Sequence, residues 1–106
     1  MIKHLTPEQL KASLDENNSM LLLDVREPWE YALCHIDKSV NISMSNISST
    51  VEKFDPESEI VVICHHGIRS LQVANYLAER GFNKLTSLEG GVDAWAKSID
   101  QTMPQY

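Results

Sequence analysis

Two largely apolar runs, at residues 20–25 and 59–64, constrain the fold of this chain more than any other feature. Each has the length of a strand, and strands that are apolar on both faces are typical of parallel sheets covered by helices. Segments with helical character follow the two runs, at residues 28–32 and 70–80. Because strands alternate with helices, the sequence predicts an α/β fold with a parallel sheet.

A helix is also predicted close to the N-terminus. Thr6 can cap it, Pro7 suits its first position and Gln9 completes a capping box. Leu10 begins an apolar stripe, and the asparagines at 17–18 mark the expected end of the helix.

The remaining elements are predicted from shorter patterns. We expect short strands at residues 40–42 and 84–87, a helix through the Ser/Asn-rich stretch 43–54, and a last helix at 92–97. Gly81 should end the helix at 70–80, since glycine is common just past helix C-termini.

The size and charge of the chain limit its partners. Its 106 residues suit one domain, and 15 Asp and Glu against 9 Lys and Arg give a net charge of −6. An acidic chain lacks the basic surface that binds nucleic acid. There is neither a secretory signal nor an apolar run long enough to span a bilayer, so we expect a cytoplasmic protein without a membrane partner.

The loop between the second apolar run and the next helix carries the clearest chemistry. Its residues are Cys64, His65, His66, Gly67, Ile68, Arg69 and Ser70. The first amides of a helix have no intrahelical partner and, with the helix dipole, form a positive pocket for an anion. We expect Cys64 to face this pocket, where its thiolate would be stabilised.

Two further loop residues fit this interpretation. Gly67 suits a backbone with positive φ, and Arg69 adds a permanent charge for binding oxyanions. The alternative is that Cys64 is only the buried last residue of a strand, because free cysteine is often buried. Glycine and arginine at this spacing argue against that alternative.

Three segments together resemble the rhodanese-like domain family. They are residues 24–36, with Asp24-Val25-Arg26-Glu27, Glu30 and His35-Ile36; the loop 64–70; and residues 88–95, which read Leu-Glu-Gly-Gly-Val-Asp-Ala-Trp. The resemblance covers about residues 5–97 of a single domain spanning 1–106, and leaves 98–106 as a C-terminal tail. It implies a five-stranded, mainly parallel sheet with helices on both faces.

The resemblance also implies a function. Cys64 would take a sulfur from a small anionic donor such as thiosulfate and pass it to cyanide or to a small or protein thiol, through a persulfide and without a cofactor. The six residues from Cys64 to Arg69 resemble the shorter loop of sulfurtransferases, whereas the related phosphatases have one more residue. A cysteine phosphatase or arsenate reductase is therefore a weaker alternative, and a partner-binding or regulatory module without turnover is another.

Other polar residues are assigned supporting roles. We expect Asp24, Arg26 and Glu30 to form ion pairs that order the site. Cys34 is either a thiol that resolves an oxidised Cys64 or a half-buried spectator, and the spectator is favoured.

The adjacent residues His65 and His66 suggest either a metal site or a pocket wall. Neighbouring histidines on a tight loop project differently, and no further ligand is spaced to complete a site. We therefore favour the pocket wall and expect no metal.

Overall fold

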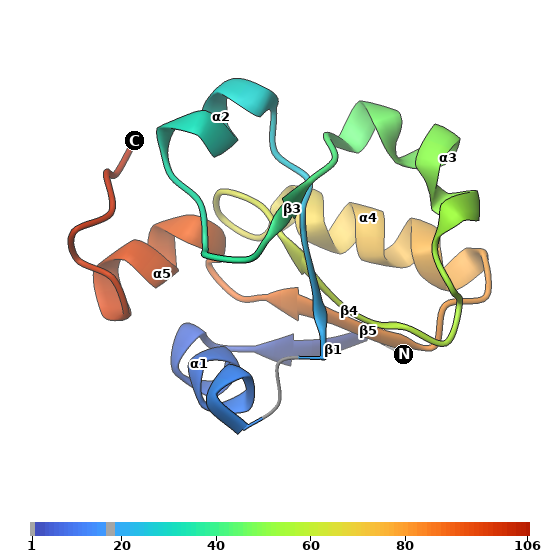
Figure 1. Cartoon of the computed structure of the whole chain (residues 1–106), viewed down its shortest axis with the longest axis horizontal. Helices are drawn as coiled ribbons and strands as arrows, with labels where there is room; N and C mark the ends of the chain where they lie inside the picture. The colour runs from blue at the N-terminus through green and yellow to red at the C-terminus, as the bar shows by residue number, and fades with distance from the viewer. Residues whose placement is uncertain (1, 17–18) are drawn as a thin grey trace.

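The computed structural model describes residues 2–16 and 19–106, and its sheet has five parallel strands in the order β1-β5-β4-β2-β3 (Figure 1). The strands are β1 (Ile2–Leu5), β2 (Leu21–Asp24), β3 (Val40–Asn41), β4 (Glu59–Ile63) and β5 (Lys84–Leu88). All four pairings are parallel, which confirms the predicted fold class. β4 lies at the centre, so a residue that follows it lies at the middle of the sheet's carboxyl edge.

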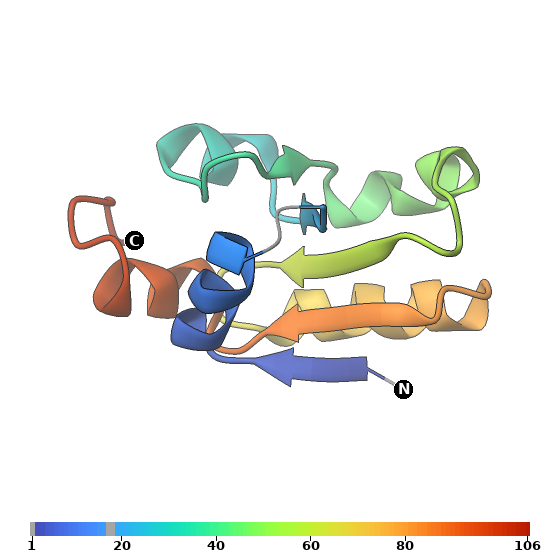
Figure 2. The ribbon, with the colours of Figure 1, turned by 60° about the horizontal axis from the view of Figure 1, so that its bottom comes forward.

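Helices cover both faces of the sheet (Figure 2). The α-helices are α1 (Pro7–Glu16), α2 (Pro28–Leu33), α3 (Ile47–Thr50), α4 (Ile68–Glu79) and α5 (Gly91–Ser98). One core cluster joins α3 and α4 to the sheet, and a second joins α1 and α5 to its other face. None of the helices within the described ranges has the length and apolar character needed to cross a membrane.

The central strand shows why the apolar runs are continuous. Ile60 and Val62 pack into the cluster under α4, whereas Val61 and Ile63 pack into the cluster under α1 and α5. Successive strand residues point to opposite faces, and here both faces are buried. The prediction from the run at 59–64 is confirmed.

Several predicted helix boundaries are confirmed. The Thr6 amide donates to Gln9 Oε1 (2.9 Å) and the Gln9 amide to Thr6 Oγ1 (3.2 Å), which is the expected capping box. Gly81, with φ of +95°, follows the end of α4. α4 itself begins at Ile68, two residues before the predicted start. The end predicted for α1 at residues 17–18 lies outside the described residues.

Two segments near the sheet edges differ from the sequence-based expectation: one prediction was wrong and one strand was missed. The single helix expected at 43–54 is divided into 3-10 turns at Met44–Asn46 and Val51–Lys53 on either side of the short α3. The Ser49 and Thr50 hydroxyls both donate to the Asn46 carbonyl, and such side-chain bonds compete with a regular helix. The second error was the missed strand β1, whose residues were assigned to no element.

Candidate active site

Cys64 follows β4 directly, and its sulfur lies against the start of α4. The Gly67 amide, at the N-cap of α4, donates to Cys64 Sγ over 2.9 Å. Gly67 has a φ of +109°, which confirms the predicted positive φ at this position. The loop therefore provides a backbone donor for a negatively charged sulfur.

The residue that carries the candidate nucleophilic sulfur is buried in this structure. Cys64 is only 1% exposed. Two surface cavities, of about 550 and 250 Å³, are lined by other segments and by no residue of the loop 64–70. These two cavities therefore lie apart from the loop that holds Cys64.

The N-terminus of α5 holds the loop in place from behind. The Val92 amide donates to the Cys64 carbonyl (2.8 Å) and the Asp93 amide to the His65 carbonyl (3.0 Å). A Cβ on Gly91 would lie 2.3 Å from the Cys64 carbonyl oxygen, so only glycine allows this approach. Sequence analysis used the Gly90-Gly91 pair only as part of a motif and missed this function.

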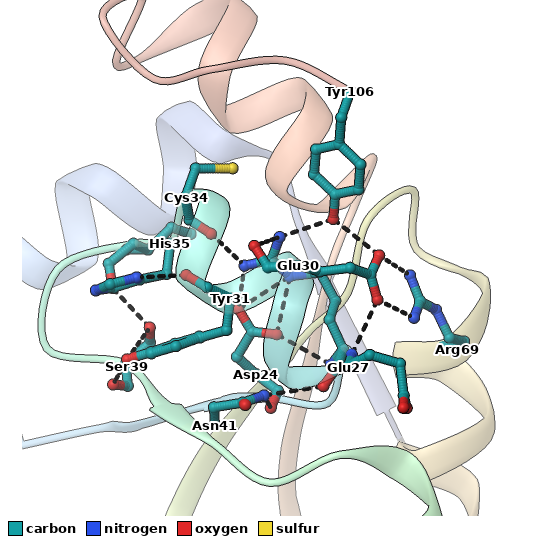
Figure 3. Close-up of polar contacts among 12 residues, drawn as sticks. Asp24, Glu27, Glu30, Tyr31, Cys34, His35, Ser39, Asn41, Arg69 and Tyr106 are labelled. Carbon is teal, nitrogen blue, oxygen red and sulfur yellow. Dashed lines mark hydrogen bonds and ion pairs between the residues drawn. The ribbon is translucent and has the colours of Figure 1, made fainter.

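Arg69 does not project freely over the loop. Its Nη1 and Nη2 donate to Glu30 Oε1 (2.7 Å) and Oε2 (2.9 Å) in a bidentate pair (Figure 3). Glu30 also accepts from the Glu27 amide, as part of the capping box that begins α2. The hydrogen bonds from Arg69 lower the pKa of Glu30 to about 2 despite its burial, and the same pair raises the pKa of Arg69.

Asp24 and Arg26 form a second, fully buried pair beside the first. Arg26 Nη2 lies 2.7 Å from Asp24 Oδ2, and Nε donates to Asp24 Oδ1 at 3.0 Å. Arg26 also donates to the carbonyls of Glu30 and Cys34. Burial opposes the charge of Arg26, but the hydrogen bonds and charges of Asp24 and Tyr106 together outweigh it and raise the pKa of Arg26. Of the three residues expected to form one ion-pair network, Asp24 and Arg26 do pair, whereas the ion pair of Glu30 is with Arg69 and its contact with Arg26 is through the Glu30 backbone carbonyl.

Tyr106 joins the two ion pairs, and sequence analysis missed it. Its hydroxyl accepts from Arg26 Nη1 (2.7 Å) and donates to Glu30 Oε2 (2.9 Å), as Figure 3 shows for the Glu30 contact. Its ring stacks on His65 with centroids 3.8 Å apart and planes 5° apart. Burial raises the pKa of Tyr106 to about 12, so the hydroxyl stays protonated and can donate. No local pattern could reveal these contacts, because the tail must first fold back.

His65 and His66 lie against each other beside Asp93. Their possible metal ligand atoms, with one from Asp93, all lie within 4.8 Å of one another. The two rings are 3.9 Å apart, centroid to centroid, and are inclined by 32°. Lys97 Nζ donates a hydrogen bond to Asp93 Oδ2 over 3.0 Å. Burial and the nearby charge of His66 lower the pKa of His65.

The remaining loop residues divide between surface and core. Ile68 is 73% exposed. Ser70 is fully buried; its hydroxyl donates to the Gly67 carbonyl (3.1 Å) and lies 2.9 Å from Ser87 Oγ. Ser70 therefore braces the loop from inside, and its side chain does not line the anion pocket as its place in the loop suggested.

Cys34 and Cys64 are free thiols in different parts of the core. Cys34 packs in the cluster under α1 and α5, whereas Cys64 packs in the cluster under α4, on the other face of the sheet. This separation supports the spectator interpretation of Cys34.

Comparison with known proteins agrees with this geometry. The model of the rhodanese-like domain matches residues 6–98. The chain is 37% identical over 93 residues to the thiosulfate sulfurtransferase GlpE of Shewanella oneidensis, with 88% of this chain and 91% of that protein covered. It is 36% identical over 93 residues to GlpE of Pseudomonas fluorescens, with 88% and 84% covered.

A solved structure shows the same fold. The crystal structure of a rhodanese-like domain protein from Staphylococcus aureus superposes with a TM-score of 0.82 at 28% identity, covering 98% of each chain. The rhodanese-like domain model thus matches nearly the whole chain. Within the matched residues, Cys64 follows the central strand and its sulfur accepts a hydrogen bond from the N-cap amide of α4. This protein belongs to the rhodanese-like domain family.

Proposed function

We propose that this protein is a sulfurtransferase in which Cys64 carries a sulfane sulfur as a persulfide, with thiosulfate as a donor and cyanide or a thiol as acceptor. The observation that carries the proposal is the Gly67 amide, which donates to Cys64 Sγ over 2.9 Å. The names of the GlpE relatives support the choice of donor.

In the first displacement, the Cys64 thiolate attacks the outer sulfur of thiosulfate. The new bond joins the two sulfurs, the S–S bond of thiosulfate breaks, and sulfite leaves with the electron pair. Negative charge stays near the loop throughout, where the fixed amide dipole of Gly67 can stabilise it without reorganising. The charge on the Cys64 persulfide is held by the same donor.

In the second displacement, cyanide or a thiolate attacks the outer sulfur of the persulfide. The bond between Cys64 Sγ and the outer sulfur breaks. The acceptor leaves with the outer sulfur, and Cys64 returns as a thiolate. The covalent intermediate divides the transfer into two easier steps. The donor, the acceptor and Cys64 account for all atoms and electrons, and no external oxidant or reductant is consumed.

The test is the intact mass of the protein after incubation with thiosulfate. Wild type should gain one sulfur atom, and Cys64→Ser should gain none. Addition of cyanide should then remove the extra mass and release thiocyanate. If wild type gains no sulfur although Cys64 can be alkylated in the native protein, thiosulfate is not a donor.

Two other functions make different predictions. A phosphatase should hydrolyse an aryl phosphate in a Cys64-dependent manner, but the short segment from Cys64 to Arg69 argues against it. A partner-binding module should keep its function in Cys64→Ser. Persulfide formation and turnover without aryl phosphate hydrolysis would reject the phosphatase.

A further inference from the structure

We propose, on the basis of the sulfur-transfer function above, that Tyr106 is a specificity-determining residue that closes the site and disfavours doubly charged donors. The donor class that the closed site favours is an organic sulfane-sulfur compound with a single negative charge. Three sets of contacts carry this inference.

The first set anchors the tail beside the loop. Tyr106 stacks on His65, the residue next to Cys64, with centroids 3.8 Å apart. Trp29, on α2, meets the Tyr106 ring edge-on at 5.8 Å and is itself 64% exposed. The Tyr106 ring therefore contacts both the loop and α2, next to the exposed side chain of Trp29.

The second set concerns the Tyr106 hydroxyl. It donates to Glu30 Oε2 (2.9 Å) while it accepts from Arg26 Nη1 (2.7 Å). Glu30 then has a partner for each oxygen besides Arg69, because the Glu27 amide donates to Oε1. This fixes the plane of the Glu30 carboxylate in the orientation that accepts both nitrogens of Arg69.

The third set is the balance of charge near the sulfur. Arg69 is neutralised by Glu30, and Arg26 is neutralised by Asp24. The charges of these two ion pairs sum to zero. The hydrogen bond to Cys64 Sγ comes from the uncharged backbone amide of Gly67. A doubly charged donor must therefore either separate Arg69 from Glu30 or bind without a paired cation. The electrostatic free-energy cost of binding at the same position is smaller for a singly charged donor.

Loss of the Tyr106 hydroxyl should weaken this arrangement. Glu30 Oε2 would turn to solvent, the pair with Arg69 would loosen, and Arg69 could reach an incoming dianion. Loss of the whole ring would also uncover His65 and the path to the sulfur.

The experiment compares two donors in the full chain at constant ionic strength, with cyanide as acceptor. Thiosulfate is the dianion and benzenethiosulfonate the monoanion, and the readout is the ratio of their kcat/KM values. In Tyr106→Phe the ratio should shift towards thiosulfate by roughly three- to tenfold, mainly through a lower KM, which is the range that one ordinary hydrogen bond supplies. Tyr106→Ala should shift it at least as far.

Tyr31→Phe is the matched control. Tyr31 also stacks on a histidine, His35, with centroids 3.9 Å apart, and its hydroxyl donates to the Ser39 carbonyl. Within residues 2–16 and 19–106, the Tyr31 side chain forms no hydrogen bond with Glu30 or Arg69. The ratio of kcat/KM values for the two donors should be the same in Tyr31→Phe as in wild type. A ratio that also shifts in this control would assign the effect to general loosening and overturn the proposal.

A second readout does not require turnover. Iodoacetamide, which is uncharged, should alkylate Cys64 at least about threefold faster in Tyr106→Ala than in wild type, as located by peptide mass. Unchanged donor ratios and alkylation rates, within twofold, would overturn the specificity function of Tyr106 while leaving sulfur transfer intact. If wild type transfers sulfur from neither donor, the proposed function fails and this inference fails with it.

Discussion

Arg69 and Glu30 are separated by 39 residues in sequence and meet in a bidentate ion pair of 2.7 and 2.9 Å. The pair joins the first turn of α4 to α2, so it fixes one side of the loop that holds Cys64. Because the Glu30 side chain is 5% exposed, its charge depends on this partner.

The pair predicts a specific dependence of stability on pH. Arg69 lowers the pKa of Glu30 from 4.5 to about 2, so the stabilisation is complete above about pH 5 and is lost as the pH falls towards 2. The difference in free energy of unfolding between wild type and Glu30→Gln should therefore shrink by about 2 kcal/mol between pH 6 and pH 3. Urea titrations at both pH values measure it. A difference that stays constant would show that Glu30 titrates normally.

Gly91→Ala should disturb the loop more than an ordinary glycine substitution. Its new Cβ would lie 2.3 Å from the Cys64 carbonyl oxygen, at a φ of +60°. Gly81→Ala is the control, since Gly81 also has a positive φ, +95°, but no atom within 4 Å of the added Cβ.

We expect Gly81→Ala to cost about 1 kcal/mol in stability and Gly91→Ala at least about 2 kcal/mol. Only Gly91→Ala should also slow sulfur loading of Cys64. Denaturant unfolding and the mass assay measure the two effects. Equal costs in the two variants would contradict the predicted steric contact.

Ser70 and Ser87 should be energetically coupled. Their hydroxyls lie 2.9 Å apart in a fully buried position, and Ser70 also donates to the Gly67 carbonyl. Either single alanine variant leaves a buried hydroxyl short of a partner, at about 1–3 kcal/mol. The double variant should therefore cost less than the sum of the single variants, by at least about 0.5 kcal/mol. Strict additivity in a double-mutant cycle would reject the coupling.

Cys34→Ala should leave sulfur loading of Cys64 unchanged. Cys34 packs in the core cluster on the other face of the sheet, where it is 7% exposed. The variant should lose about 1 kcal/mol of stability through the lost burial of its thiol. Loading is measured by intact mass, and protection of Cys64 during mild oxidation is measured by alkylation. Loss of that protection in the variant would assign Cys34 a resolving function.

The local sequence determined the layers of the fold and the centre of the site. Continuous apolar runs can bury both faces of β2 and β4 only between two layers of helices, so they predict the parallel sheet. Gly67 and the start of α4 likewise predict a loop that directs an amide at Cys64. These features depend on neighbouring residues, which is why a short pattern reveals them.

The tertiary structure decided what surrounds that centre. β1 contributes only four residues, and its pairing with β5 depends on a distant strand, so no local period predicts it. Likewise, the contacts of Tyr106 with His65 and Glu30 exist because the segment after α5 returns across the molecule. The sequence by itself therefore places the sulfur and its amide donor, whereas the closing of the site and the neutralising of Arg69 arise from long-range contacts that only the folded chain brings together.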